Sequence, residues 1–190
     1  MGINMATYFI ADLHFGHKNI LGFDKRPWIN IEDHDVALIK NWNEAVGYED
    51  DVYILGDISW YNATKTIEIF KQLNGKKHLI IGNHDYHNLK SPEVRALFME
   101  IAHYVEIDCE SKQLVLSHYP IVSFNGHFYN GIHLYGHVHN SFEWEYVERC
   151  KQIMIKELGK PCRMFNVGAM MKYMNYTPRT LNEILKQEQQ

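Results

Sequence analysis

The chain has 190 residues, of which 46% are hydrophobic and 22% charged, and its formal net charge is −4. This composition is ordinary for a soluble globular protein, and the length predicts a single domain over residues 1–190. Because the chain is acidic and has no block of lysine and arginine, it gives no strong nucleic-acid signal.

Apolar runs and capping patterns predict alternating strands and helices in the first half of the chain. The expected strands cover residues 8–11, 52–55 and 78–81. The expected helices cover residues 30–47, 64–73 and 91–103. The helix at 30 begins like a capping box, and Ser91-Pro92 is a strong start for the last one.

The second half is predicted to begin with a hairpin around residues 110–112. The expected strands cover residues 105–109, 113–117, 132–135 and 163–167. The pattern at 142–158 is ambiguous, and we favour a helix that ends at Gly159. Thr180 and Glu183 predict a capped terminal helix. Mixed sheets layered between helices follow from this order.

No apolar run reaches the ~18 residues of a membrane span, and the first residues lack the basic and apolar regions of a secretory signal. We therefore expect no membrane partner. The three cysteines, at 109, 150 and 162, are odd in number and lack Cys-x-x-Cys spacing. They fit the reducing cytoplasm better than a disulfide framework.

Clusters of metal-ligating side chains directly follow several of these apolar runs. The clusters are Asp12-Leu13-His14, Gly56-Asp57, Gly82-Asn83-His84-Asp85 and Gly136-His137-Val138-His139, with His118 at the end of a further strand. Because side chains at the carboxyl ends of neighbouring strands meet in one crevice of an α/β fold, we expect them to form one site.

The donor types indicate a pair of transition-metal ions. On an extended backbone, residues i and i+2 point the same way, so Asp12 and His14 are expected to reach one ion. His137 and His139 repeat this spacing. Asp57 has two oxygens and can bridge two ions, with Gly56 permitting the tight turn. Nitrogen and oxygen donors without thiolates leave Mn2+, Fe2+/Fe3+ or Zn2+.

In this order, the clusters resemble the signature of the calcineurin-like metallophosphoesterase superfamily. Residues 12–20 are similar to its small bacterial and phage members. The resemblance implies an α/β fold built as a four-layer α/β/β/α sandwich, with two mixed sheets flanked by helices. It also implies a hydrolase of phosphoric ester bonds with two divalent transition-metal ions, of which Mn2+ is expected and Fe, Zn2+ or Ni2+ are alternatives.

The resemblance further implies a role for each residue. The first ion would be held by Asp12, His14, Asp57 and His139. The second would be held by Asp57, Asn83, His118 and His137. A hydroxide that bridges both ions would attack phosphorus, and His84 would protonate the leaving group as general acid.

Other residues have less defined roles. Asp85 would orient His84 or support its loop, and the two are the expected catalytic pair. The expected substrate contacts are His17, Asn83 and His84. For His17, two alternatives stay open: support of His14, or an ordinary loop position. Lys18 and Arg26 either line the path of an anionic substrate or are plain solvated charges.

The expected activity is that of a phosphodiesterase acting on a small phosphodiester or nucleotide-like substrate. Ile81 precedes Gly82, at the position of the arginine in the Arg-Gly-Asn-His-Glu pattern of protein Ser/Thr phosphatases. Ile58-Ser59-Trp60 follows Asp57, where many relatives have further acidic or arginine residues. Two phosphate-binding arginines are therefore absent, which argues against a phosphoprotein phosphatase. The alternatives are a nuclease or nucleic-acid end-processing enzyme and, less favoured, a non-catalytic binding scaffold.

Overall fold

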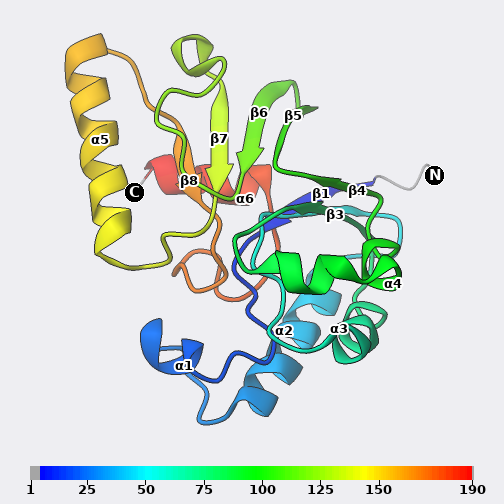
Figure 1. Ribbon diagram of the computed structural model, residues 1–190. Coiled ribbons are helices and arrows are strands. Elements are labelled where there is room, and N and C mark those ends of the chain that lie inside the picture. Colours follow the sequence, from blue (N-terminus) through cyan, green and yellow to red (C-terminus); the bar gives the residue numbers. More distant parts are fainter. Residues whose placement is uncertain (1–4, 190) are drawn as a thin grey trace.

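The computed structural model describes residues 5–189, which form two mixed β-sheets between layers of helices (Figure 1). The first sheet has the strand order β4-β3-β2-β1-β9, and the second has the order β5-β6-β7-β8. Ile54 of the first sheet and Leu116 of the second belong to one buried cluster, so the two sheets pack against each other. Val115 and Tyr135 join a separate cluster with Val147 of helix α5 (Phe142–Leu158). The expected four-layer arrangement is confirmed.

The first sheet brings the carboxyl ends of its central strands to one edge. Its parallel strands are β1 (Thr7–Ile10), β2 (Asp51–Ile54), β3 (Lys76–Ile80) and β4 (Glu100–Ala102). A short strand, β9 (Arg179–Thr180), pairs antiparallel with β1. Ile10 pairs with Ile54, which pairs with Leu79 on β3. The loops that follow β1, β2 and β3 are therefore neighbours.

The second sheet begins with the predicted hairpin. Its strands are β5 (Tyr104–Cys109), β6 (Lys112–Ser117), β7 (Ile132–Tyr135) and β8 (Met164–Asn166). β5 and β6 are antiparallel, whereas β6, β7 and β8 are parallel. Glu110 and Ser111 both have positive φ, 50° and 60°, as a two-residue type I′ hairpin turn requires. The loops after β6 and β7 meet those of the first sheet, because His118 contacts the carbonyl of Leu55 (2.7 Å) and the backbone N–H of His137 donates to Asp12 (3.1 Å).

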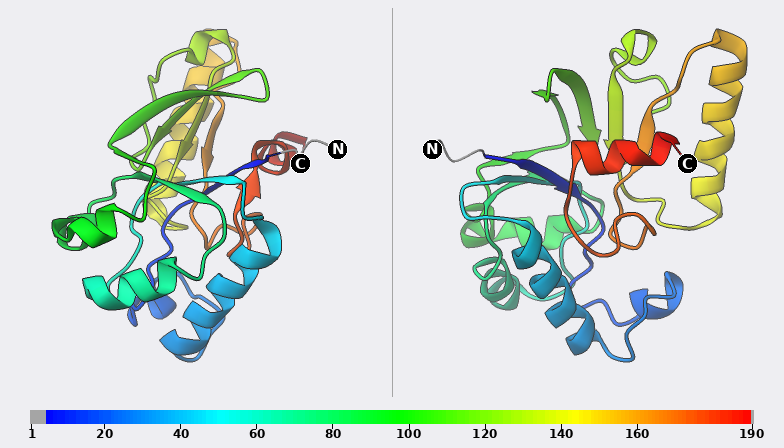
Figure 2. Two further views of the ribbon diagram at one scale, coloured as in Figure 1. Left: turned by 90° about the vertical axis from the view of Figure 1, so that its right-hand side faces the viewer. Right: turned by 180° about the vertical axis from the view of Figure 1, so that it is seen from behind.

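Helices cover the outer sides of both sheets (Figure 2). The α-helices beside the first sheet are α2 (Ile31–Ala45), α3 (Ala63–Phe70) and α4 (Pro92–Arg95). The remaining helices are α1 (Ile20–Phe23), α6 (Leu181–Leu185) and the 3-10 turns η1 (Asp85–Lys90), η2 (His127–Tyr129) and η3 (Lys186–Gln189). Asn30 caps α2, and Thr180 with Glu183 forms the predicted capping box of α6. Within the described part of the chain, no helix has the length and apolar character that crossing a bilayer requires.

The prediction of one helix over residues 91–103 is wrong beyond its first turn. Ser91 caps α4 as expected, but α4 ends at Arg95 and residues 100–102 form strand β4. Phe98 is buried and packs against Phe70 of α3, with 5.5 Å between ring centroids. Pairing with β3 then satisfies the backbone of β4. Tertiary packing and the sheet ladder thus override a local helix preference.

Candidate metal centre

The strand-end loops hold the predicted ligands in a left-handed backbone conformation. φ is 55° at Asp12, 54° at His14, 56° at Asp57, 69° at His137 and 49° at His139. This region is uncommon for residues other than glycine, and such strained positions cluster at functional sites. The expectation of an extended backbone at these i, i+2 pairs is therefore wrong. Left-handed turns aim the side chains instead.

Neighbouring loops hold these turns in place through their backbones. The N–H of Asp12 donates to the carbonyl of Gly56 (3.0 Å), and the N–H of His14 donates to that of Asp57 (3.0 Å). Gly56 itself has φ 86°, and a Cβ there would lie 2.4 Å from Nδ1 of His118. Only glycine therefore fits the crossing of these loops.

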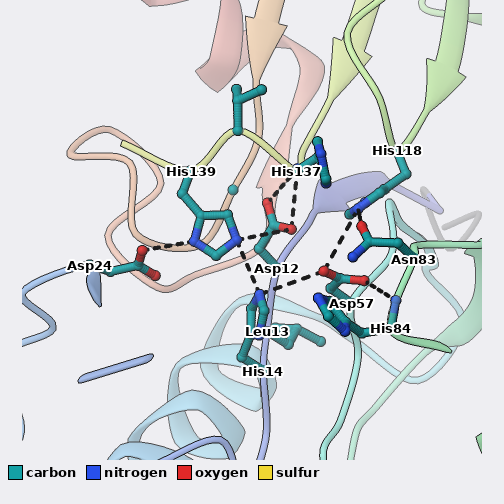
Figure 3. Close-up of polar contacts among 12 residues, drawn as sticks. Asp12, Leu13, His14, Asp24, Asp57, Asn83, His84, His118, His137 and His139 are labelled. Atoms are coloured by element: carbon teal, nitrogen blue, oxygen red, sulfur yellow. Dashed lines mark hydrogen bonds and ion pairs between the residues drawn. The ribbon is translucent and has the colours of Figure 1, made fainter. Parts of the chain in front are cut away.

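One group of donors comprises Asp12, His14 and His139 (Figure 3). Their ligand atoms lie within 4.8 Å of one another. Nε2 of His14 is 3.2 Å from Nε2 of His139, which in turn is 3.7 Å from Oδ1 of Asp12. Two imidazole nitrogens and a carboxylate that face one another at such distances are suited to a shared cation.

A second group comprises Asp12, Asp57 and His118. Nε2 of His118 lies 3.7 Å from Oδ2 of Asp57 and 3.0 Å from Oδ1 of Asn83. The same Asp57 oxygen is 3.8 Å from Nε2 of His14 in the first group. Asp12 belongs to both groups, and one oxygen of Asp57 lies between the imidazole of His14 in the first group and that of His118 in the second.

Outer hydrogen bonds leave the Nε2 atoms free to bind. A carbonyl oxygen can only accept, so Nδ1 of His118 donates to the carbonyl of Leu55 (2.7 Å). Nδ1 of His139 donates to Oδ1 of Asp24 (2.7 Å) in the same way. In the neutral form of both rings, this places the lone pair on Nε2, which points into the cluster. When neutral, these two rings thus have the tautomer that metal binding needs.

The electrostatics of the cluster also favour a cation. Burial, with Arg26 and His139 nearby, holds the pKa of His14 well below its usual value, so its imidazole is neutral. Burial raises the pKa of the Asp57 carboxyl, an effect that His118 opposes and Asp12 reinforces. Burial lowers the pKa of His139, but Asp12 and Asp24 together outweigh it and raise the net value. Crowded buried carboxylates beside imidazoles are the donor set of a divalent metal site.

A cavity of about 350 Å³ opens onto these donors. Its lining consists of His14, His17, Ile20, Phe23, Asp57, Trp60, Asn83, His84, His137 and His139. His137 belongs to neither donor group, but its backbone N–H donates to both oxygens of Asp12 (3.2 and 3.1 Å). Its ring lies 5.0 Å from that of His118. The structure thus brings all seven predicted metal ligands to one place.

His17, another predicted substrate contact, lies at the wall of this cavity. Nδ1 of His17 is 3.2 Å from Nδ1 of His14, and its ring stacks on Trp60 with 4.0 Å between centroids. Burial, with His84 and Arg26 nearby, lowers the pKa of His17. His17 thus lies against His14 and Trp60 in the lining of the cavity.

His84 and Asp85 have different surroundings. The side chain of His84 is exposed at the cavity, and its ring centroid lies 4.4 Å from that of Trp60. The backbone N–H of His84 donates to Oδ1 of Asp57 (2.9 Å). Asp85 is fully buried and accepts from the N–H groups of Gly82 (2.7 Å), Asp57 (3.1 Å) and Ile58 (2.8 Å). Asp85 was predicted either to orient His84 or to support its loop, and these contacts match the second role.

Three residues important to the site were not identified as such from the sequence. Arg26 is 4% exposed, and its guanidinium donates to Asp24 and to the carbonyls of Asp12 and Leu13. Neither alternative considered for Arg26, a substrate path or a solvated charge, is therefore correct. Asp24 and Trp60 were missed because they lie in loops without a periodic pattern. The signal available was the appearance of Trp60 three residues after Asp57.

Comparison with known proteins agrees with this geometry. The sequence model of calcineurin-like phosphoesterases matches residues 5–161. An uncharacterized protein of Methanocaldococcus jannaschii is 32% identical over 181 residues, which cover 94% of this chain and 89% of that protein. The Gene 66 protein of Mycobacterium phage L5 is 40% identical over 82 residues, 42% of this chain and 39% of that protein. A protein of unknown function from Aquifex aeolicus has a similar structure, with a TM-score of 0.64, 25% identity and coverage of 97% of this chain and 100% of that chain.

The chain therefore belongs to the calcineurin-like phosphoesterase family. It is a hydrolase that acts on phosphoric ester bonds, and the family implies divalent metal ions, for which the described residues provide two groups of ligands.

Proposed function

We propose that the protein is a dinuclear phosphodiesterase that hydrolyses a small phosphodiester or nucleotide-like substrate. The observation that carries the proposal is the place of Asp57, whose Oδ2 is 3.8 Å from Nε2 of His14 and 3.7 Å from Nε2 of His118. A carboxylate oxygen between imidazoles of the two groups is placed to bridge two metal ions, as a two-metal phosphoesterase site needs.

The proposal divides the seven predicted ligands between two ions, with Asp57 shared by both. Asp12, His14, Asp57 and His139 would hold one ion. Asp57, Asn83, His118 and His137 would hold the other. Mn2+ suits this mixture of nitrogen and oxygen donors, with Fe, Zn2+ or Ni2+ as alternatives. When bound, such ions supply a nucleophile at neutral pH and stabilise negative charge on the phosphoryl group.

The chain's own side chains would complete the reaction. As the bond from water oxygen to phosphorus forms and the bond to the leaving oxygen breaks, His84 would donate an imidazole proton to that oxygen. Its exposure at the cavity supports this role. His17, Asn83 and His84 would contact the substrate. Asp85 would act as a positioning residue, because it fixes the loops that carry Asp57 and His84.

A diester is favoured over a monoester by the charges around the cavity. In the described part of the chain, neither lysine nor arginine lines it. A diester carries one negative charge near neutral pH and a monoester up to two, so the monoester needs more compensating charge. We also propose that residues 1–190 form one catalytic domain. The three cysteines are unpaired, which supports a cytoplasmic location.

The test is hydrolysis by metal-stripped protein to which Mn2+, Zn2+, Ni2+ or Mg2+ is returned singly. Bis-p-nitrophenyl phosphate reports diesterase activity, p-nitrophenyl phosphate reports monoesterase activity, and a dinucleotide tests a poor leaving group. We expect metal-dependent cleavage with the diesters preferred. His84→Asn should keep its metal content and lose about 10²–10⁴-fold in turnover of the dinucleotide.

The matched control is His103→Asn, because His103 is exposed outside the cavity. It should leave turnover unchanged. Dinucleotide cleavage by His84→Asn at the wild-type rate would overturn the role of His84. Absence of diester cleavage with every metal, in protein that binds two ions, would overturn the proposed activity.

A further inference from the structure

The cavity over the candidate metal centre has an apolar part as well as a polar one. Its apolar lining residues are Ile20, Phe23 and Trp60. Ile20 and Phe23 belong to α1, which Figure 1 shows set apart from both sheets. Ligand cavities usually combine apolar surface with a few polar groups that fix the orientation of the ligand. The apolar part is therefore suited to contact the portion of a substrate that is not the phosphate.

Phe23 is the exposed member of this apolar part. Its side chain is 72% exposed, whereas that of Ile20 is 2% exposed. Among residues 5–189, one ring lies near that of Phe23: the imidazole of His17, at 6.2 Å between centroids and with 75° between the ring planes. No ring of the described chain therefore stacks in parallel on Phe23. A large exposed ring at the wall of a cavity is suited to take such a partner from a ligand.

Trp60, by contrast, already has ring partners within the chain. The imidazoles of three histidines lie between 4.0 and 4.5 Å from it, centroid to centroid: His17, His84 and His14. The plane of the His17 ring is within 6° of that of Trp60. Trp60 thus packs among the imidazoles of the wall, and Phe23 offers the freer aromatic face in the lining.

Hydrogen bonds on either side of Phe23 fix its place relative to the candidate metal ligands. Its backbone N–H donates to the carbonyl of Asn19 (3.1 Å). The next residue, Asp24, is 4% exposed, and its carboxylate accepts from Nδ1 of His139 (2.7 Å). The side-chain amide of Asn140 donates to the carbonyl of Asp24 (3.3 Å). A ring whose backbone is held in this way loses little freedom when a ligand stacks on it, and such preorganisation strengthens binding.

We propose that Phe23 determines substrate specificity by stacking on a planar ring of the substrate while the phosphate lies at the metal centre. The substrate is then a diester that carries a nucleobase or a similar flat aromatic group, and an aliphatic diester such as a glycerophosphodiester is disfavoured. Phe23 selects among the substrates of the phosphodiesterase proposed above, on which this assignment rests. Stacking of a base on an aromatic side chain strengthens binding about 5–100-fold.

The test is calorimetric titration of the Mn2+-loaded protein with AMP and with ribose 5-phosphate. The two ligands share a ribose and a phosphate and differ by the base, and chromatography checks that both stay intact. We expect AMP to bind at least about fivefold more tightly than ribose 5-phosphate. Because the readout is the ratio of two affinities, a change that affects only phosphate binding cancels.

Phe23→Ala should lower this ratio to below about twofold, and Phe23→Tyr, which keeps a ring, should retain it. Since the side chain is mostly exposed, Phe23→Ala should fold and bind Mn2+ as the wild type does. Tyr48→Ala is the matched control and should leave the ratio unchanged. Tyr48 is 80% exposed and precedes β2, whereas Asp57 and the cavity lie beyond the other end of that strand.

Three results would overturn the role of Phe23: equal binding of AMP and ribose 5-phosphate by the wild type, an unchanged ratio in Phe23→Ala, or an equal decrease in Tyr48→Ala. If any of these occurs while bis-p-nitrophenyl phosphate is cleaved, the proposed activity stands and the role of Phe23 fails. If the ratio depends on Phe23 but no diester is cleaved with any metal, the proposed activity fails and Phe23 remains a residue that binds the base.

Discussion

Replacing Arg26 by methionine should damage both the fold and the candidate metal centre. The guanidinium donates through Nε (2.9 Å) and Nη2 (2.8 Å) to one oxygen of Asp24. It also donates to the carbonyls of Leu13 (3.1 Å) and Asp12 (2.9 Å), which belong to the left-handed turn that carries two of the proposed ligands. One side chain thus fixes this turn and the carboxylate that orients His139.

The size of the effect follows from burial. Arg26 and Asp24 are both 4% exposed. Burial raises the pKa of the Asp24 carboxyl, but its bonds to His139 and Arg26 outweigh burial and lower the net value, so Asp24 is charged. Removing one member of such a buried pair costs about 3–5 kcal/mol. The two carbonyls lose donors as well, so we expect the free energy of unfolding to fall by about 4 kcal/mol or more.

Urea unfolding gives the stability, and titration with Mn2+ gives the metal affinity. Arg26→Met should bind Mn2+ about 10–100-fold more weakly, as expected when an outer support of metal ligands is lost. Arg26→Lys keeps the charge but loses the planar fork of donors. Its free energy of unfolding and its Mn2+ affinity should lie between those of the wild type and Arg26→Met. Asp24→Asn combined with Arg26→Met should be less destabilised than the sum of the two changes. If Arg26→Met lowered the free energy of unfolding by less than about 1 kcal/mol and left the Mn2+ affinity unchanged, this reasoning would be refuted.

Three further predictions concern single residues. Gly56→Ala should lose about 3 kcal/mol in urea unfolding, because φ is 86° and the new Cβ would lie 2.4 Å from Nδ1 of His118; Gly22→Ala, with open space around it, should not. Burial lowers the pKa of His133 to about 4, against ~6.5 when unfolded. The unfolded chain therefore takes up the proton first, and the free energy of unfolding should fall by about 2 kcal/mol between pH 7.5 and 5, a decrease that His133→Gln should remove; an unchanged pH slope in the variant would contradict it. Asp57→Ala should bind neither ion in elemental analysis, and retention of two ions would exclude a bridging role.

Much of the architecture follows from the sequence because its signals are local. Apolar runs mark the strands that end at residues 10, 54 and 80, and Asn30 and Thr180 mark the starts of two helices by their capping. The error at residues 91–103 arose where local and long-range preferences disagree. Strand β4 owes its conformation to β3, some twenty residues earlier, and no short-range pattern records that pairing.

The candidate site, too, was predictable from the sequence only in part. The residues predicted as its ligands lie together because they directly follow strands, and strand ends converge whatever the loop conformation. The turn geometry was not predicted, because the left-handed conformation at Asp12 and His14 is held by hydrogen bonds to loops far along the chain. Asp24 and Arg26 were missed as supports for a related reason. Their partners are a ring more than a hundred residues away and two backbone carbonyls, which leave no trace in residue spacing.

The left-handed turns tie the lifetime of the protein to the supply of metal. Five strained non-glycine residues at about 1 kcal/mol each amount to about 5 kcal/mol, a large share of the ~5–15 kcal/mol that holds a typical domain together. Ions that bind only the folded chain restore stability in proportion to the logarithm of their concentration. In a cell starved of the divalent metal that the site takes, chains would therefore open more often and be degraded sooner. The abundance of the enzyme would then follow its cofactor without any dedicated regulator.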